Sequence, residues 1–99
     1  MKPRSTLSET LHSLCEHVYF QPPTGYMLQY PCIIYEFTGV EKRHADNLGY
    51  TMYGVYSLTY ITRDPDDDTK LDLAALPMCS MNQSYESDNL YHYGYKIYH

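Results

Sequence analysis

The first pattern along the chain is a set of apolar residues at helical spacing. Its members are Leu7, Leu11, Leu14, Cys15 and Val18. Thr6 is followed three residues later by Glu9, which is the pattern of a capping box at the start of a helix. We therefore predict a helix from Thr6 to about His17. A short extended piece at residues 19–21 follows and ends at a Pro-Pro pair.

Two strand-like segments come next. Residues 32–37 are β-branched and aromatic, which predicts a central strand. Residues 38–49 are polar without periodicity, which predicts a connection. Residues 50–63 alternate as a long strand, in which Gly54 is expected to mark a bulge or a close backbone approach. One face of that strand carries Tyr50, Met52, Tyr56, Leu58 and Tyr60; the other carries Thr51, Tyr53, Val55, Thr59 and Ile61.

The remaining segments complete the predicted fold. An acidic loop leads into a short helix that Asp68 or Thr69 caps and Pro77 ends. Strands at 79–85 and 90–98 flank a tight turn, which predicts a β-hairpin. The order of elements indicates one α+β domain over residues 1–99. We expect a mainly antiparallel sheet of about four to five strands, with the N-terminal helix and the short second helix packed on one face. The predicted core is Leu11, Leu14, Ile33, Ile34, Leu58 and Ile61.

Composition narrows the class of protein. The 99 residues include seven Lys and Arg against 12 Asp and Glu, a net charge of −5, which disfavours non-specific binding to phosphate groups. The chain has no apolar run long enough to cross a membrane and no apolar N-terminal segment, so neither a membrane span nor a secretory signal is expected. Three widely spaced cysteines form no C-x-x-C pair. They favour reduced thiols in a cytosolic protein over a disulfide framework or a zinc site.

Candidate chemistry is sparse. The acidic loop carries Asp64, Asp66, Asp67 and Asp68, but it lacks the glycine and the final glutamate of a calcium-binding loop. We expect these four carboxylates to face solvent, on a channel lumen or a ring rim, without a metal. The histidines are not spaced to share a ligand face, and no nucleophile or phosphate-loop motif occurs. The sequence therefore predicts no catalytic residue, no cofactor and no enzyme activity.

The feature that needs explanation is the number of tyrosines, 13 in all. One reading is a sheet with a core face and an amphipathic face. A second is that the outer face contacts other subunits, because Tyr is enriched at interfaces. Stacking of single-stranded bases is a third, which the acidic balance disfavours. The candidate oligomer interface comprises the loop 38–49 and Tyr50, Tyr53, Tyr56, His92, Tyr93 and Tyr95.

Several segments resemble the small tail-completion proteins of long-tailed phages. A short N-terminal helix is followed by VYFQPP at 18–23 and YPCIIY at 30–35. The resemblance continues through Ala45-Asp46-Asn47 and YITRDPD at 60–66. It ends with LPMCS at 76–80 and a Tyr-rich hairpin around DNL at 88–90. It covers nearly the whole chain, and its motifs are structural.

The resemblance implies a tail terminator. Such proteins form a six-fold ring on the head-proximal end of the tail tube, stop its polymerisation and dock the head-closure protein. It implies a homo-hexamer in the virion neck, made in the bacterial host cytoplasm, with DNA passing through without sequence-specific binding. It implies the same α+β fold and no catalytic residues. The alternatives are a head-closure or adaptor protein of the connector, and a small non-viral α+β binding module or enzyme subunit.

Overall fold

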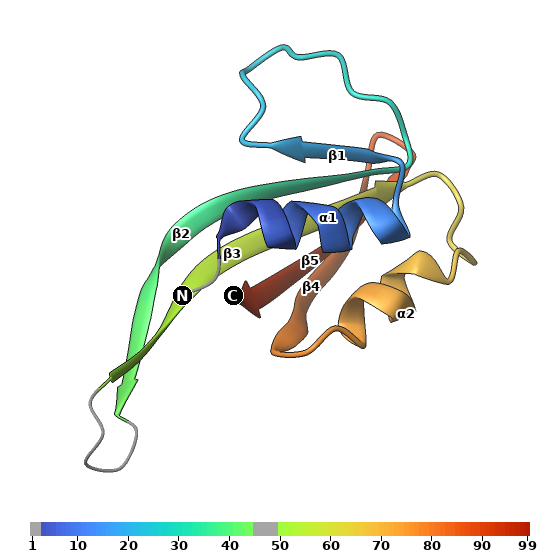
Figure 1. The fold of residues 1–99 in the computed structure, drawn as a ribbon. Helices are drawn as coiled ribbons and strands as arrows, with labels where there is room; N and C mark the ends of the chain where they lie inside the picture. The colour runs from blue at the N-terminus through green and yellow to red at the C-terminus, as the bar shows by residue number, and fades with distance from the viewer. Residues whose placement is uncertain (1–2, 45–49) are drawn as a thin grey trace.

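The computed structural model describes residues 3–44 and 50–99, and it confirms an α+β fold. Within these residues, two helices and five strands follow one another (Figure 1). Their bounds are α1 Arg4–Leu14, β1 His17–Phe20, β2 Cys32–His44, β3 Tyr50–Thr62, α2 Thr69–Ala74, β4 Cys79–Ser87 and β5 Leu90–Tyr98. The strands form one sheet in the order β1-β2-β3-β5-β4, in which only the β1–β2 pair is parallel.

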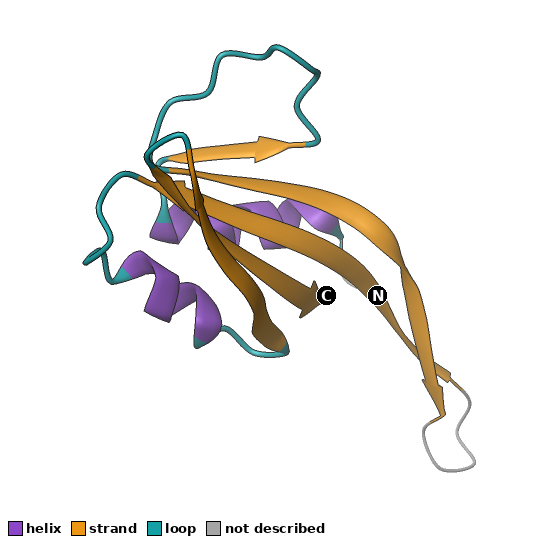
Figure 2. Cartoon of the chain, turned by 180° about the vertical axis from the view of Figure 1, so that it is seen from behind, coloured by secondary structure: helices purple, strands orange, loops and turns teal. Residues whose placement is uncertain are grey.

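Both helices lie on the same side of the sheet (Figures 1 and 2). We call that side the helix face and the opposite side the far face. Leu7 and Leu11 of α1 and Leu73 of α2 are fully buried against it. The strands contribute alternate residues, as a half-buried pleated sheet requires. The strand residues of this core are Ile33, Tyr35, Tyr56, Leu58, Tyr60, Tyr93, Tyr95 and Ile97.

Four of the predicted core residues are buried or packed as expected, and two differ. Leu11, Ile33 and Leu58 are buried in the core cluster, and Leu14 packs against its edge. Ile61 is buried too, but it lies on the far face. Ile34 is only half-buried, so its assignment to the core was wrong. The pleat places Ile33 and Tyr35 toward the helices and turns Ile34 away from them.

The predicted capping box does not form. Helix α1 begins at Arg4 with Pro3 as its N-cap, and no side chain caps it. Thr6 lies within the first turn, where its backbone N–H donates to the carbonyl of Pro3 at 3.2 Å. Proline before a helix needs no N–H of its own, and its fixed φ suits the entry of the chain. The helix ends at Leu14 because Cys15 is already extended, so Val18 belongs to β1.

The predicted polar connection at 38–49 was also wrong in its first half. Strand β2 continues to His44 and pairs with β3 along its whole length, with one bulge between Phe37 and Gly39. The predicted bulge at Gly54 is absent from this pairing; instead the Gly54 carbonyl accepts the N–H of His99 at 2.7 Å. The remainder of the predicted connection, including Ala45-Asp46-Asn47, lies outside the described residues.

Beyond the body of the domain, β2 and β3 form a projecting ribbon (Figure 1). Strand β1 pairs with β2 only up to Tyr35, and β5 pairs with β3 only from Val55 onward. Residues 37–44 and 50–54, here called the arm, therefore extend past the neighbouring strands. The molecule measures 51 × 27 × 22 Å, so the arm makes a small domain markedly elongated.

The closing hairpin confirms the predicted tight turn. Asp88 and Asn89 have φ values of 54° and 63°, which is the left-handed conformation of a two-residue type I′ turn. Asp and Asn tolerate this conformation better than most residues, because their short side chains bond to nearby backbone. The turn sets the register in which Ser87 faces Leu90 and Tyr85 faces His92.

Candidate functional site

Three of the six residues expected at a subunit interface are core residues instead. Tyr56, Tyr93 and Tyr95 are buried on the helix face, and Tyr95 has no exposed surface. This corrects the expectation that they face a neighbouring subunit. Tyrosine is suited to a core as well as to a subunit interface, because its ring fills a core while its hydroxyl can reach a polar partner at the edge. The alternation on β5 showed that Tyr93 and Tyr95 share a face, but not that this face lies under the helices.

The hydroxyls of the buried tyrosines have partners at the edge of the helix layer. Tyr95 donates to the carbonyl of Lys70 in α2 at 2.7 Å. Tyr60 donates to the carboxylate of Asp67, and Tyr35 accepts from the Arg4 guanidinium at 3.0 Å. These bonds attach both helices and the acidic loop to the sheet. Burial, together with the bond to Asp67, raises the pKa of Tyr60 to about 12, and burial also raises the pKa of Tyr95.

The other candidate interface residues lie elsewhere. His92 is half-buried on the far face, where its ring stacks on the exposed ring of Tyr85 with centroids 4.7 Å apart. Tyr53 is half-buried on the far face of the arm. Tyr50 begins β3, but its side chain lies outside the described part of the chain. A contact of these three with another subunit remains a prediction.

The acidic loop does not present all four carboxylates to solvent. Asp64, Asp66 and Asp68 are exposed as expected, but Asp67 is half-buried. Its carboxylate accepts from the Tyr60 hydroxyl and from the backbone N–H of Thr69 at 2.8 Å. Partial burial acts to raise the pKa of Asp67, but these bonds and the charge of Lys70 outweigh it and hold the pKa below its ordinary value. Asp67 thus joins the loop to the sheet and to Thr69, the first residue of α2, which corrects its assignment to the solvent-facing set.

The thiols and the acidic groups show little that could hold a ligand. Burial raises the pKa of all three cysteine thiols, Cys15, Cys32 and Cys79. The pKa is about 12 for Cys32 and about 11 for Cys79, so each side chain remains a thiol at neutral pH. Within residues 3–44 and 50–99, no three His, Cys, Asp or Glu side chains gather closely enough to hold a metal ion.

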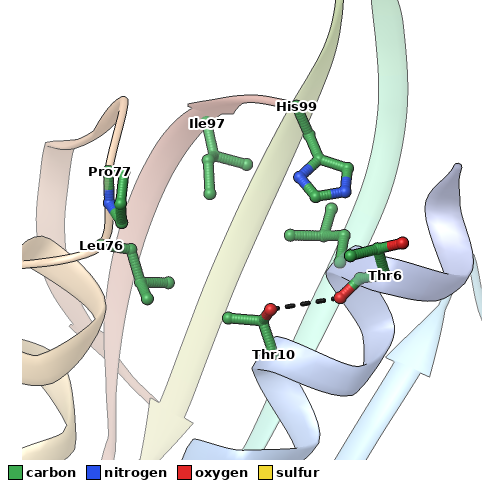
Figure 3. Close-up of a pocket in the computed structure, with 7 residues that line it drawn as sticks. Thr6, Thr10, Leu76, Pro77, Ile97 and His99 are labelled. Carbon is green, nitrogen blue, oxygen red and sulfur yellow. Dashed lines mark hydrogen bonds between the residues drawn. The ribbon is translucent and has the colours of Figure 1, made fainter. Parts of the chain in front are cut away.

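A small hollow opens between α1, the segment after α2 and the end of β5 (Figure 3). It holds about 160 Å³ and is lined by Thr6, Leu7, Thr10, Leu76, Pro77, Ile97 and His99. The Thr10 hydroxyl donates to the Thr6 carbonyl at 3.1 Å, and His99 Nε2 lies 3.2 Å from the Pro3 carbonyl. A hollow of this size takes about one benzene-sized group. Its chemistry fits an apolar side chain better than a polar substrate.

The arm carries an exposed apolar surface, of which the sequence analysis named only the segment 38–49, as a loop. On its helix face, Phe37, Val40 and Met52 are 43%, 46% and 39% exposed. They continue the core face of the sheet past the point where α1 and α2 cover it. Large apolar side chains grouped on a projecting element indicate a contact surface. The alternation of β3 placed Met52 on the same face as Tyr56 and Leu58, whereas Phe37 and Val40 join that face only through the pairing of β2 with β3.

Comparison with known proteins adds no family: the chain matches no protein-family model, no curated protein and no solved structure. Among the described residues, no helix has the length and apolar character needed to traverse a lipid bilayer.

Proposed function

We propose that this protein is a ring-forming structural protein of a phage neck, a tail terminator that caps the tail tube and joins the tail to the head. The observation that carries the proposal is the arm, which projects from a small domain and exposes Phe37, Val40 and Met52. A subunit with such an extension is suited to contact a neighbour rather than to act alone. The residue-level resemblance of segments 18–23, 30–35 and 60–66 to tail-completion proteins supports the same class.

The physical properties of the chain suit this role. A 99-residue domain has a limited core, and contacts between folded subunits stabilise it further by mass action. Subunits that present two different patches close into a ring when the rotation between them allows. A net charge of −5 suits a channel that DNA crosses without adhering, because like charges repel. The proposed partners are five further copies, the tail tube protein and the head-closure protein.

The test is the assembly of the full chain. Native mass spectrometry and negative-stain electron microscopy of the purified protein over a range of concentrations are expected to show a six-fold ring. A protein that stays monomeric at every concentration, with and without isolated tail tubes, contradicts the proposal. A ring that sediments with tail tubes fits a terminator, whereas one that binds only filled heads fits a head-closure or adaptor protein.

A second candidate is a small binding module outside any virion. The hollow of about 160 Å³ beside α1 is the observation that favours it. Here the protein is expected to remain monomeric, and Ile97→Phe, which fills the hollow, is expected to abolish binding of a small apolar ligand. Ring assembly that is unchanged in Ile97→Phe favours the structural role.

The gene neighbourhood also separates the tail terminator from the binding module, since a terminator gene is expected between head–neck genes and the major tail protein gene.

A further inference from the structure

Helix α2 carries an exposed apolar side chain on its outer side. Leu73 is fully buried against the sheet, and the residues on the opposite side of the helix recur at helical spacing. They are Asp68, Leu71, Asp72 and Ala75, and all four are exposed. Leu71 is 59% exposed, and among the described residues it is the one large apolar side chain on a helix that lies so open to solvent.

The helix face of the arm is the complementary surface. In the body of the domain α1 and α2 cover this face of the sheet, whereas on the arm it exposes Phe37, Val40 and Met52. The arm bends toward the side on which the helices lie, so this face is the inner side of a hook (Figures 1 and 2). A concave apolar sheet surface fits the convex outer side of a helix, which is how the chain already buries its own helices.

The two surfaces also differ in the sign of their charge. Residues 64–72 carry five Asp against one Lys, whereas the arm carries one Glu against one Lys and one Arg. The ammonium of Lys70 donates to the carbonyl of Pro65 and lies 5.4 Å from the centroid of the Tyr93 ring, so it is directed to the body of the domain. The outer side of α2 therefore keeps the negative charge of its two aspartates, and electrostatic complementarity favours a partner with excess positive charge.

We propose that the arm of one copy of this chain packs its helix face against the outer side of α2 of a second copy, with Val40 and Met52 around Leu71. The inference rests on the proposed assembly of copies and specifies its subunit contact. The contact joins two different patches of the chain. It repeats as a ring when the rotation between neighbours closes, and it forms a reciprocal pair when that rotation is 180°.

The other exposed apolar residues of the chain suit the arm less well. Residues 22–30 include the exposed Tyr26 and Met27 but no charged residue, and β4 has Glu86 as its single charge. Only the outer side of α2 combines a large exposed apolar side chain with flanking carboxylates among the described residues. The partner is a second copy because both complementary surfaces are present on this chain.

The first experiment uses two variants that each disable one surface. Val40→Lys on the arm and Leu71→Lys on α2 change exposed side chains, so circular dichroism is expected to show both folded. Each variant alone is expected to weaken self-association by about tenfold or more in native mass spectrometry, since a buried ammonium without a partner opposes the contact. Met27→Lys, at an 87% exposed loop residue, is the matched control and is expected to assemble as the wild type does.

An equimolar mixture of the two variants shows whether the two surfaces contact each other. It is expected to form a heterodimer and nothing larger, because the intact arm of Leu71→Lys meets the intact α2 of Val40→Lys. If either variant alone retains the wild-type assembly, or if both weaken it and the mixture does not recover a heterodimer, the proposal is wrong. A ring that persists in those cases still supports the neck function.

The assembly of the wild type separates this contact from the proposed function. A wild-type chain that forms only a dimer, and whose variants and mixture behave as expected, supports the contact and overturns the six-fold ring. A wild-type chain that never assembles overturns both.

The second experiment tests the charges and does not depend on the lysine variants. Asp68 makes no side-chain cap bond to α2, so a double variant Asp68→Asn with Asp72→Asn is expected to fold. It is expected to weaken assembly by about threefold or more at low salt, and to remove most of the salt dependence of the wild-type association. The control is Glu86→Gln with Asp88→Asn, which removes two charges at the hairpin end. An equal loss in the two double variants contradicts a contact at α2.

Discussion

At the residue scale, the buried tyrosines hold the layers of this domain together through their hydroxyls. Tyr60 shows the consequence most clearly, because its ring lies in the core while its hydroxyl donates to Asp67. We expect Tyr60→Phe to lower the free energy of unfolding by about 1 kcal/mol, the usual value of one hydrogen bond. Urea denaturation measures this, with Tyr85→Phe as the control, since the Tyr85 ring is 48% exposed. An equal loss in both variants contradicts a special role for Tyr60.

The same residue predicts a dependence on alkaline pH. The pKa of Tyr60 is raised to about 12 in the folded protein, above the value of about 10 in an unfolded chain. The neutral hydroxyl is favoured by folding, so its contribution is complete below pH 10 and is lost as the pH rises toward 12. Thermal denaturation from pH 8 to pH 12 is expected to show a steeper loss for the wild type than for Tyr60→Phe. Parallel curves contradict this assignment.

Neighbouring isoleucines on β2 give a second comparison at this scale. Ile33 is fully buried against the helices, whereas Ile34 is half-buried on the far face. Ile33→Ala is expected to cost about 2–5 kcal/mol of stability, the range for a core truncation, and Ile34→Ala clearly less. Urea denaturation of the two variants side by side is the measurement. A larger loss for Ile34→Ala means that the far face carries more of the core than the structure indicates.

At the element scale, the closing hairpin depends on its turn. Asn89 has a φ of 63°, which glycine adopts freely and alanine does not. Asn89→Gly is expected to leave stability nearly unchanged, whereas Asn89→Ala is expected to lose about 1 kcal/mol. Thermal denaturation of the two variants measures the difference. Equal stability of the two variants contradicts a left-handed turn at this position.

The acidic loop gives an element-scale prediction about metals. Asp64 and Asp67 use carboxylate oxygens to accept the backbone N–H groups of Asp66 and Thr69. The loop is thus ordered by its own hydrogen bonds, and calcium is not needed to neutralise a shared site. Millimolar calcium or EDTA is expected to leave the melting temperature unchanged. A rise of several degrees with calcium indicates a site that forms on binding.

The elements differ in how far the sequence could predict them. β3 and β5 followed from their alternation, and the turn at Asp88 and Asn89 followed from its residue types. The second half of β2 did not, because Lys42 and its neighbours show no alternation of their own. That segment becomes a strand by pairing with β3, which is a tertiary effect. The exposed apolar face of the arm could be found only once this pairing was known.

At the scale of the whole molecule, the arm accounts for the elongated shape of the domain. The radius of gyration is 14.5 Å, against roughly 13 Å for a compact domain of this length. The excess comes from a ribbon that extends away from the core instead of packing on it (Figure 2). Such a ribbon contributes little to the stability of one subunit. Its apolar residues gain from burial only when a neighbour covers them, so assembly and stability are expected to be linked.

That linkage predicts a melting temperature that depends on protein concentration. Assembly binds the folded chain and not the unfolded one, so the wild type is expected to melt at higher temperature as its concentration rises. Val40→Lys, which places a charge on the exposed apolar face of the arm, is expected to melt at one temperature throughout, at the value of the dilute wild type. The control variant Met27→Lys, at an 87% exposed loop residue, is expected to follow the wild-type trend. Differential scanning calorimetry over about a hundredfold range of concentration tests this. If the wild type assembles with no change in melting temperature, the arm contributes nothing to the stability of the assembly, and its exposed apolar face needs another explanation.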